Sequence, residues 1–135
     1  MITAVVPVYN EKESLDKFYP RLKEALSKID KNHEIIFVDD GSTDSSLEII
    51  KKLASKDSSI GVYSFRKNQG KSEALTYGFK MAKGDYIVTL DADLQDRPEE
   101  IENLMDKLKE GFDLVSGWRK NRKDAIYMKL PSKLF

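Results

Sequence analysis

Short apolar runs alternate along the chain with segments of helical periodicity, and this alternation limits the fold more than any other feature. The runs are rich in β-branched and aromatic residues and span 2–8, 34–38, 60–65, 86–90 and 112–115. Several lack a polar residue at every second position, which is typical of strands covered on both faces of a parallel sheet. The alternation predicts an α/β fold in which an open, mostly parallel, twisted sheet carries helices on both faces.

Four helices are expected between these strands, because apolar residues recur there every three or four positions. The four apolar stripes begin at Leu15, Leu47, Ala74 and Ile101. Around the fourth helix, Asp96 and Glu99 have the spacing of a capping box, Pro98 suits the first turn and Gly111 suits the end.

The composition excludes several kinds of chemistry. The chain has no cysteine and a single histidine, His33, which excludes disulfides, thiolate zinc sites, cysteine nucleophiles and His-rich metal sites. Its 135 residues are the length of one domain. It has neither an apolar run of the roughly 18 residues that a membrane span needs nor a signal-peptide pattern. We expect a cytoplasmic domain whose chemistry depends on carboxylates, amides, hydroxyls and basic groups, with no role for His33.

Basic residues are concentrated near the end of the chain. Lys and Arg equal Asp and Glu at 23 each, so the overall charge gives no reason to expect a nucleic-acid partner. From Arg119 onward, however, six bases accompany one acid. This tail is either a solvated loop or a segment that folds over a site and holds a pyrophosphate. The second interpretation is possible because the arginine guanidinium group can donate two hydrogen bonds to the oxygens of one phosphate.

The chain is divided accordingly into a core at 1–118 and a basic loop with the start of a further region at 119–135. A short helix is expected between this loop and Pro131. The sequence stops at Phe135 without a terminating signal, so we expect it to be the N-terminal portion of a longer protein. A sheet edge left open in this way could pair with a second copy and give a homo-oligomer.

A polar cluster follows each of the predicted strands. The clusters lie at 9–11, 39–44, 66–71, 91–96 and 116–119. In an open parallel sheet, ligands bind beyond the carboxyl ends of the strands, which share one edge. The five clusters are therefore expected to line one crevice.

Asp91-Ala92-Asp93 is the sharpest of these clusters. Two carboxylates one residue apart at a strand end can face one cation, and Gln95 could add a carbonyl oxygen. Hard oxygen ligands of this kind suit Mg²⁺ or Mn²⁺. The alternative is that Asp91 and Asp96 only end a strand and cap a helix, and for Asp96 alone this alternative is the better interpretation.

The cluster after the second strand offers two further carboxylates. Asp39 and Asp40 could accept hydrogen bonds from a ribose or from the edge of a base. The alternative is helix capping by Ser42 or Thr43 with Gly41 at the turn, and both can hold together.

The segment 68–71, Asn-Gln-Gly-Lys, opens the third helix. Backbone N–H groups at a helix start bind anions, and Lys71 adds a positive charge. Alone the signal is weak, and a solvated lysine is the alternative.

Taken together and in order, these motifs resemble glycosyltransferases of family 2, which have the GT-A fold, a Rossmann-like nucleotide-sugar-binding domain. The segments that carry the resemblance are 7–11, 38–44, 68–71, 91–96 and 117–122. The branch that they resemble most contains dolichol-phosphate mannose synthase and bacterial polyprenyl-phosphate glycosyltransferases. Members of the family continue well beyond the length seen here, into an acceptor-binding part and often into C-terminal membrane helices.

The resemblance implies a role for each matching position. Asp91 and Asp93 would be catalytic, and the ligands of Mg²⁺ or Mn²⁺ would be Asp91, Asp93 and Gln95. Asp39 would contact the base, and Lys133 could help to hold the diphosphate. The residues implied to bind the nucleotide-sugar are Pro7, Tyr9, Asn10, Glu11, Asp39, Asp40, Asn68, Gly70, Lys71, Asp91, Ala92, Asp93, Arg119 and Arg122.

The activity implied is metal-dependent, inverting transfer of a hexose from a UDP- or GDP-sugar to a polyprenyl or dolichyl phosphate, or to another acceptor. It would take place in the cytoplasm or at the cytoplasmic face of a membrane. One alternative is a receiver-like, Mg²⁺-binding signalling domain, although in such domains the acid pair follows the first strand and here it follows the second. The other is a nucleotide-sugar-binding domain that is not catalytic on its own.

Overall fold

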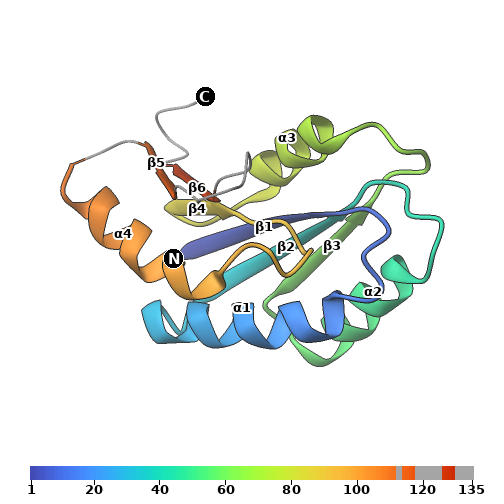
Figure 1. The fold of residues 1–135 in the computed structure, drawn as a ribbon, viewed down its shortest axis with the longest axis horizontal. Helices are drawn as coiled ribbons and strands as arrows, with labels where there is room; N and C mark the ends of the chain where they lie inside the picture. The colour runs from blue at the N-terminus through green and yellow to red at the C-terminus, as the bar shows by residue number, and fades with distance from the viewer. Residues whose placement is uncertain (112–113, 118–125, 130–135) are drawn as a thin grey trace.

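The polypeptide alternates between strands and helices from its first residues, as Figure 1 shows. The computed structural model describes residues 1–111, 114–117 and 126–129. Its elements are β1 (Ile2–Val8), α1 (Leu15–Ile29), β2 (His33–Asp39), α2 (Ser46–Lys56), β3 (Ile60–Ser64), α3 (Lys71–Met81), β4 (Tyr86–Thr89), the 3₁₀ turn η1 (Pro98–Glu100), α4 (Ile101–Lys109), β5 (Leu114–Gly117) and β6 (Ile126–Lys129). The predicted strands and helices are therefore present, close to their expected bounds.

The strands form one sheet in the order β3-β2-β1-β4-β6-β5. The first four are parallel, with Val8 of β1 beside Asp39 of β2 and Val5 of β1 beside Thr89 of β4. This confirms the open, mostly parallel sheet. The short helix expected before Pro131 is wrong for residues 126–129, which form β6 and pair antiparallel with β4 and β5. Pairing with two neighbours outweighs the local preference of so short a segment.

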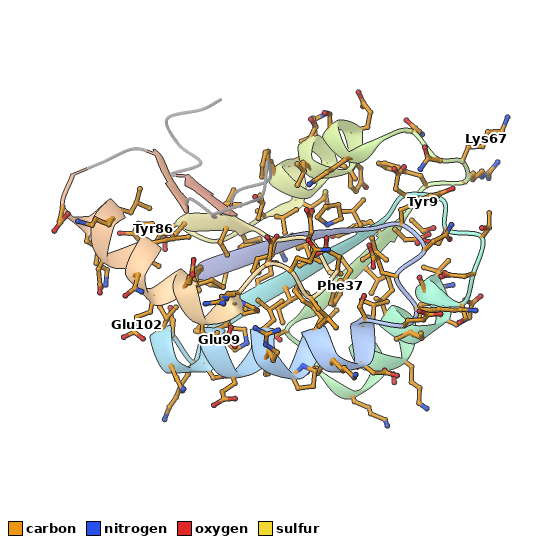
Figure 2. All side chains as sticks on the ribbon, viewed as in Figure 1. Tyr9, Phe37, Lys67, Tyr86, Glu99 and Glu102 are labelled. Carbon is orange, nitrogen blue, oxygen red and sulfur yellow. The ribbon has the colours of Figure 1, made fainter. Side chains whose placement is uncertain are left out.

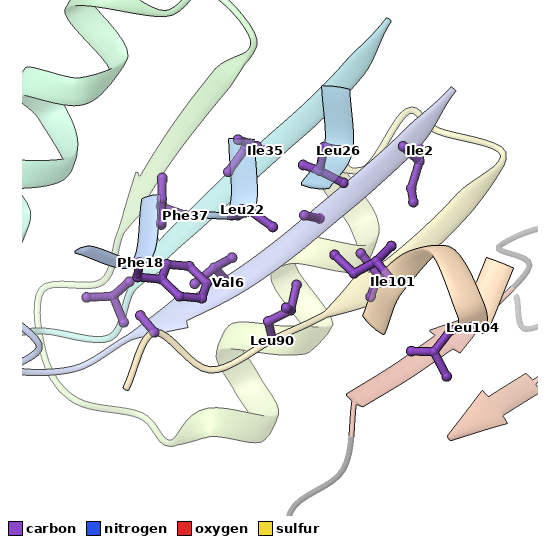
Figure 3. Packing of buried hydrophobic residues seen from close by; sticks show 14 of the residues in the cluster. Ile2, Val6, Phe18, Leu22, Leu26, Ile35, Phe37, Leu90, Ile101 and Leu104 are labelled. Carbon is purple, nitrogen blue, oxygen red and sulfur yellow. The ribbon is translucent and has the colours of Figure 1, made fainter. Parts of the chain in front are cut away.

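Helices cover both faces of the sheet, as predicted. Helices α1, α2 and α4 lie on one face and α3 lies on the other (Figure 1). The larger apolar cluster joins Val6 of β1 to Phe18 of α1 and Ile101 of α4 (Figure 3). A smaller cluster joins Val38 of β2 to Ala74 of α3. Burial on both faces explains why β1 and β2 are apolar without alternation.

The capping box expected for the fourth helix is wrong. Asp96 accepts a hydrogen bond from the backbone N–H of Asp91 at 2.6 Å. Glu99 instead forms a two-point ion pair with Arg21 of α1, with nitrogen–oxygen distances of 3.0 Å. Residues 98–100 form the turn η1 without a side-chain cap. Gly111 does follow α4 and has φ 115°, a conformation that suits glycine.

Helix α3 approaches β1 closely at Gly78. A Cβ atom at this position would lie 2.3 Å from Cγ1 of Val5. Gly78 and Val5 are both buried. The absence of a side chain at position 78 therefore fixes how near the helix lies to the central strand.

We expect Gly78→Ala to lower the free energy of unfolding by about 1–3 kcal/mol, because a methyl group there overlaps Val5. At an exposed helical site the same change would stabilise the protein. A decrease in the free energy of unfolding would therefore indicate the overlap with Val5. Urea unfolding measures the effect. Gly61→Ala in β3 is the matched control, since its nearest contact would be at 3.5 Å. A loss no larger than that of the control would contradict the close approach.

A polar network joins α1 to the loop between α2 and β3. The Asp57 carboxylate lies 3.0 Å from Lys23 Nζ and accepts hydrogen bonds from Tyr19 and Ser59. Lys23 Nζ also lies 3.0 Å from Nε2 of His33, which therefore belongs to this network. Burial alone would raise the pKa of the Asp57 carboxyl, but the bonds from Tyr19, Ser59 and Lys23 hold this pKa well below its usual value.

We expect Asp57 to make stability depend on pH under acid conditions. Its pKa is depressed in the folded state, so its contribution is present above the unfolded pKa of about 4 and is lost as pH falls below that value. Asp57→Asn should remove about 2 kcal/mol of stability at pH 7 and much less at pH 2. Urea unfolding of both proteins at the two pH values tests this. An equal deficit at both would contradict it.

Candidate functional site

A cleft of about 210 Å³ opens where β1, β2 and β4 end at one edge of the sheet. It is lined by Pro7, Val8, Tyr9, Glu11, Asp40, Lys71, Asp91, Ala92 and Asp93. All of these except Val8 were expected to bind a ligand. Tyr9 is 45% exposed and lies at this end of the sheet, whereas Tyr86 marks the other end (Figure 2). The predicted convergence of strand-end clusters is thus present for the segments that follow β1, β2 and β4, and the cluster that follows β3 reaches the cleft through Lys71.

The register of the sheet explains why distant segments meet here. The backbone N–H of Asp40 donates to the carbonyl of Val8 at 2.8 Å, and that of Leu90 donates to Val5 at 3.2 Å. The chain therefore leaves three neighbouring parallel strands at the same edge: β1 and β2 end together at Val8 and Asp39, and β4 ends at Thr89, beside Val5. Strand β5 ends at this edge too, because Ser116 and Thr89 are both paired with Tyr127 of β6.

Four carboxylates and one ammonium group line the cleft. Among its described lining residues, Lys71 is the one cation. Its Nζ lies 2.7 Å and 2.9 Å from the two carboxylate oxygens of Asp91. Burial raises the pKa of the Glu11 carboxyl, and the negative charges of Asp93 and Asp91 raise it further, against a hydrogen bond from Ser14. The cleft therefore retains an excess of negative charge.

The turn after β4 is held in an uncommon conformation. Leu94 has φ 67°, which non-glycine residues rarely adopt. The backbone N–H of Gln95 donates to Oδ1 of Asp93 at 3.0 Å, and Ser14 of the β1–α1 loop donates its hydroxyl to the carbonyl of Ala92 at 2.5 Å. These contacts fix the segment that presents Asp91 and Asp93 to the cleft. Gln95 itself is exposed and does not line it.

The expected set of metal ligands is only partly assembled. Over residues 1–111, 114–117 and 126–129, no group of three or more Asp, Glu, His or Cys side chains is arranged to hold a metal ion. Asp91 and Asp93 line one cleft and offer the hard oxygen atoms that Mg²⁺ or Mn²⁺ prefers. Both oxygens of Asp91 are engaged by Lys71. The donor chemistry thus fits a divalent cation, and the arrangement of the side chains places Lys71 in competition with it.

Asp40 holds the loop that leads into α3. Its carboxylate accepts hydrogen bonds from the backbone N–H groups of Gln69 at 2.7 Å and Gly70 at 3.0 Å, and from the side-chain amide of Asn68 at 3.0 Å. Gly41 lies against this loop, since a Cβ there would come within 2.5 Å of the backbone nitrogen of Asn68. The N–H groups of residues 69 and 70, at the helix start that was expected to bind a ligand anion, are therefore engaged within the protein in this structure. Asp40, an anion of the protein itself, already occupies them.

Asn10 positions a loop and does not line the cleft. It has φ 53°, and its side-chain oxygen accepts hydrogen bonds from the backbone N–H groups of Thr43 at 2.9 Å and Asp44 at 3.3 Å. Its own backbone N–H donates to the hydroxyl of Ser42 at 2.9 Å. Ser42 and Thr43, the residues expected to cap α2, bond instead to Asn10. Asp44 bonds to the helix, because it accepts a hydrogen bond from the N–H of Ser46 at 2.8 Å. These bonds fasten the β1–α1 loop to the β2–α2 loop.

Asp39 is 1% exposed, and the described residues satisfy only one of its two carboxylate oxygens. Its Oδ2 accepts hydrogen bonds from the hydroxyl of Ser64 at 3.1 Å and the N–H of Ser42 at 3.3 Å. Its Oδ1 is buried and, within the described part of the chain, has no hydrogen-bond partner. A buried acceptor without a donor is costly. Asp39 is not itself among the residues that line the cleft. Ser64 was missed by sequence analysis, although its place at the end of β3, in register with Asp39, was the available signal.

The remaining expected residues divide into two groups. Asn68 and Gly70 build the loop and do not line the cleft. Arg119, Arg122 and Lys133 lie outside the described residues.

Comparison with known sequences assigns a family to nearly the whole chain. The model of the family described as Glycosyl transferase family 2 matches residues 3–134. An undecaprenyl-phosphate 4-deoxy-4-formamido-L-arabinose transferase of Aeromonas hydrophila subsp. hydrophila is 42% identical over 99% of this chain. The enzyme of the same name from Salmonella choleraesuis is 44% identical over 98% of it. The chain spans 41% of the length of each of these relatives.

Comparison with solved structures shows the same fold. A mannosyltransferase of Pyrobaculum calidifontis, in complex with GDP-Man and Mn²⁺, gives a TM-score of 0.81 at 19% identity, over 96% of this chain and 44% of that one. Glucosyl-3-phosphoglycerate synthase of Mycobacterium tuberculosis, with Mn²⁺, UDP and phosphoglyceric acid, gives 0.75 at 21% identity, over 99% of this chain and 57% of that one. These likenesses confirm the predicted GT-A architecture. In the described part of the chain, no helix has the length and apolarity to cross a bilayer.

We expect Asp40→Ala to lower the free energy of unfolding by about 2–3 kcal/mol, because three donors lose their acceptor. Hydrogen exchange at the amides of Gln69 and Gly70 should accelerate as well. Urea unfolding and exchange measured by NMR check both effects. Asp106→Ala, an exposed change on α4, is the control and should shift stability by less than about 0.5 kcal/mol. Unchanged exchange at residues 69 and 70 would show that Asp40 does not hold the loop.

Proposed function

Since the chain belongs to glycosyltransferase family 2, we propose that it forms the donor-binding part of a metal-dependent, inverting glycosyltransferase that transfers a sugar to a polyprenyl phosphate. The observation that carries this proposal is the cleft at the carboxyl edge of the sheet, which gathers Tyr9, Lys71, Asp91 and Asp93. This family membership excludes the receiver-like signalling domain.

The nucleoside of the donor is assigned to the side of the cleft formed by β1 and β2. Tyr9 offers an exposed ring that a base or ribose can lie against. Oδ1 of Asp39 is a buried acceptor suited to an N–H group of a base, and Ser64 holds the opposite oxygen of the same carboxylate. Pro7 and Glu11 complete the lining on the β1 side.

The diphosphate is assigned to the side formed by β4 and the start of α3. Asp91 and Asp93 would hold a divalent cation, with Gln95 as a further oxygen donor nearby. Such a cation supplies positive charge that stabilises the departing nucleoside diphosphate. Two of the similar structures, the mannosyltransferase and glucosyl-3-phosphoglycerate synthase, are complexes with Mn²⁺, which supports this choice of metal. Lys71 would donate to phosphate oxygens, together with Arg119 and Arg122.

The acceptor and the sugar are proposed from the similar enzymes. The names of these relatives specify undecaprenyl phosphate as acceptor and 4-deoxy-4-formamido-L-arabinose, a pentose, as the sugar. They favour a pentose over the hexose expected from sequence. A polyprenyl phosphate is largely ionised at pH 7, because its second pKa is about 6, so it attacks the sugar C1 without a strong general base. Inversion at C1 follows from a single in-line displacement. The lipid acceptor places the reaction at a membrane surface.

The chain spans 41% of the length of these relatives. We therefore assign donor binding to these residues and sugar transfer to the whole enzyme. Residues equivalent to the remainder of those enzymes would supply the acceptor side. The other hypothesis from the sequence, a binding domain that is not catalytic on its own, is therefore retained for these 135 residues in isolation.

We expect the chain to bind a UDP- or GDP-sugar in the presence of Mn²⁺ and to lose that binding in EDTA. Asp93→Ala should reduce binding in Mn²⁺ to the level measured in EDTA, because one of its metal ligands is removed. Isothermal titration calorimetry with both classes of nucleotide-sugar measures this and identifies the base. Asp106→Ala is the matched control. Binding by Asp93→Ala at the wild-type level would contradict the metal assignment.

Asp39→Asn separates the nucleoside contact from the metal contact. The side chain keeps its size but loses its charge, so nucleotide affinity should fall on the order of tenfold. The dependence on Mn²⁺ should remain, since Asp39 lies outside the cation site. If Asp39→Asn bound nucleotide as tightly as the wild type does, the assignment of the buried oxygen to the base would be wrong.

A further inference from the structure

Lys71 and Asp91 form an ion pair across the cleft. Nζ of Lys71 lies 2.7 Å from Oδ1 and 2.9 Å from Oδ2 of Asp91, so one ammonium group engages both oxygens. The Asp91 side chain is 19% exposed and that of Lys71 is 51% exposed. The pair can therefore be reached from solvent, and exchange of the ammonium group does not require the fold to open.

The backbone on both sides of this pair is held in place. Lys71 is the first residue of α3, directly after the loop that Asp40 fixes through Gln69 and Gly70. The same helix rests against β1 at Gly78. On the other side, the N–H of Asp91 donates to Asp96 at 2.6 Å. The backbone of Lys71 is thus fixed, and its long, flexible side chain carries the ammonium group to Asp91.

The electrostatics explain why a cation lies here before any ligand binds. Glu11, Asp40, Asp91 and Asp93 all line the cleft, and Lys71 is the one cation among its described lining residues. A cation that leaves Asp91 exposes this group of carboxylates to mutual repulsion. A second cation that binds the Asp91 carboxylate must therefore displace the ammonium group of Lys71.

Building on the proposed function, we infer that Lys71 is an exchangeable counterion that occupies the Asp91 oxygens and blocks a divalent cation from them until a nucleoside diphosphate arrives. The diphosphate offers the ammonium group new acceptor oxygens. Lys71 then moves from Asp91 to phosphate, and Asp91 becomes available as a ligand. Metal and nucleotide consequently strengthen each other's binding by the same factor. Binding of the metal alone is weak because Lys71 competes with it.

The test measures Mn²⁺ alone, without nucleotide, by the loss of the electron paramagnetic resonance signal of free Mn²⁺. Lys71→Gln should bind Mn²⁺ on the order of tenfold more tightly than the wild type, because the competing charge is gone. Lys71→Arg keeps the charge and should resemble the wild type. Lys67→Gln is the matched control, since Lys67 is exposed, extends away from the body of the protein in Figure 2 and does not line the cleft.

Nucleoside diphosphate binding at saturating Mn²⁺ completes the test. Under these conditions we expect the opposite ranking of affinities. Lys71→Gln should bind UDP or GDP more weakly than the wild type does, because a phosphate contact is lost. Unchanged or weaker Mn²⁺ binding by a folded Lys71→Gln, verified by circular dichroism, would overturn the inference. If the wild type binds Mn²⁺ with nucleotide while Lys71→Gln shows no gain for Mn²⁺ alone, only this inference fails. If the wild type binds neither, the proposed function fails.

Discussion

Burial of β1 on both faces is the constraint on which the rest of the structure depends. This strand pairs with β2 and β4, packs against α1 through Val6 and contacts α3 at Val5. Because its neighbours are parallel to it, the chain must return each time by a helix and must leave each strand at the same edge. The cleft is the direct result. Residues as far apart as Tyr9 and Asp93 line one cleft because β1 and β4 are parallel neighbours that end at the same edge of the sheet.

The sequence predicted the architecture well because two-sided burial leaves a local trace, the continuous apolar run. It also predicted most of the cleft, since strand ends in such a sheet share one edge. It could not assign roles within the cleft. Asp40 and Asn10 look like ligand-binding residues in the sequence, yet they accept hydrogen bonds from segments 28 and 33 residues away. Whether a polar side chain turns to a ligand or to a neighbouring loop depends on which donors the fold brings beside it.

The elements that sequence analysis missed share a physical cause. Strand β6 is set by pairing with β4 and β5, and a four-residue segment has too little local preference to reveal it. The predicted capping box does not form, because Asp96 accepts a hydrogen bond from the N–H of Asp91 and Glu99 forms an ion pair with Arg21. Ser64 carries no motif and gains its importance only from lying beside Asp39. For β6, Glu99 and Ser64, a contact between segments distant in the sequence decided the outcome. Asp96 bonds instead to the backbone of Asp91, five residues before it.

The contact between Gly78 and Val5 has a consequence for how this protein can evolve. The two positions share one small volume between α3 and β1, and position 78 cannot gain a Cβ atom unless the side chain at position 5 gives up volume. A larger residue at position 78 thus becomes acceptable in a background where position 5 has already been reduced, for example to alanine. Sequence drift at the two positions is therefore coupled, and the order in which substitutions arrive determines which of them survive.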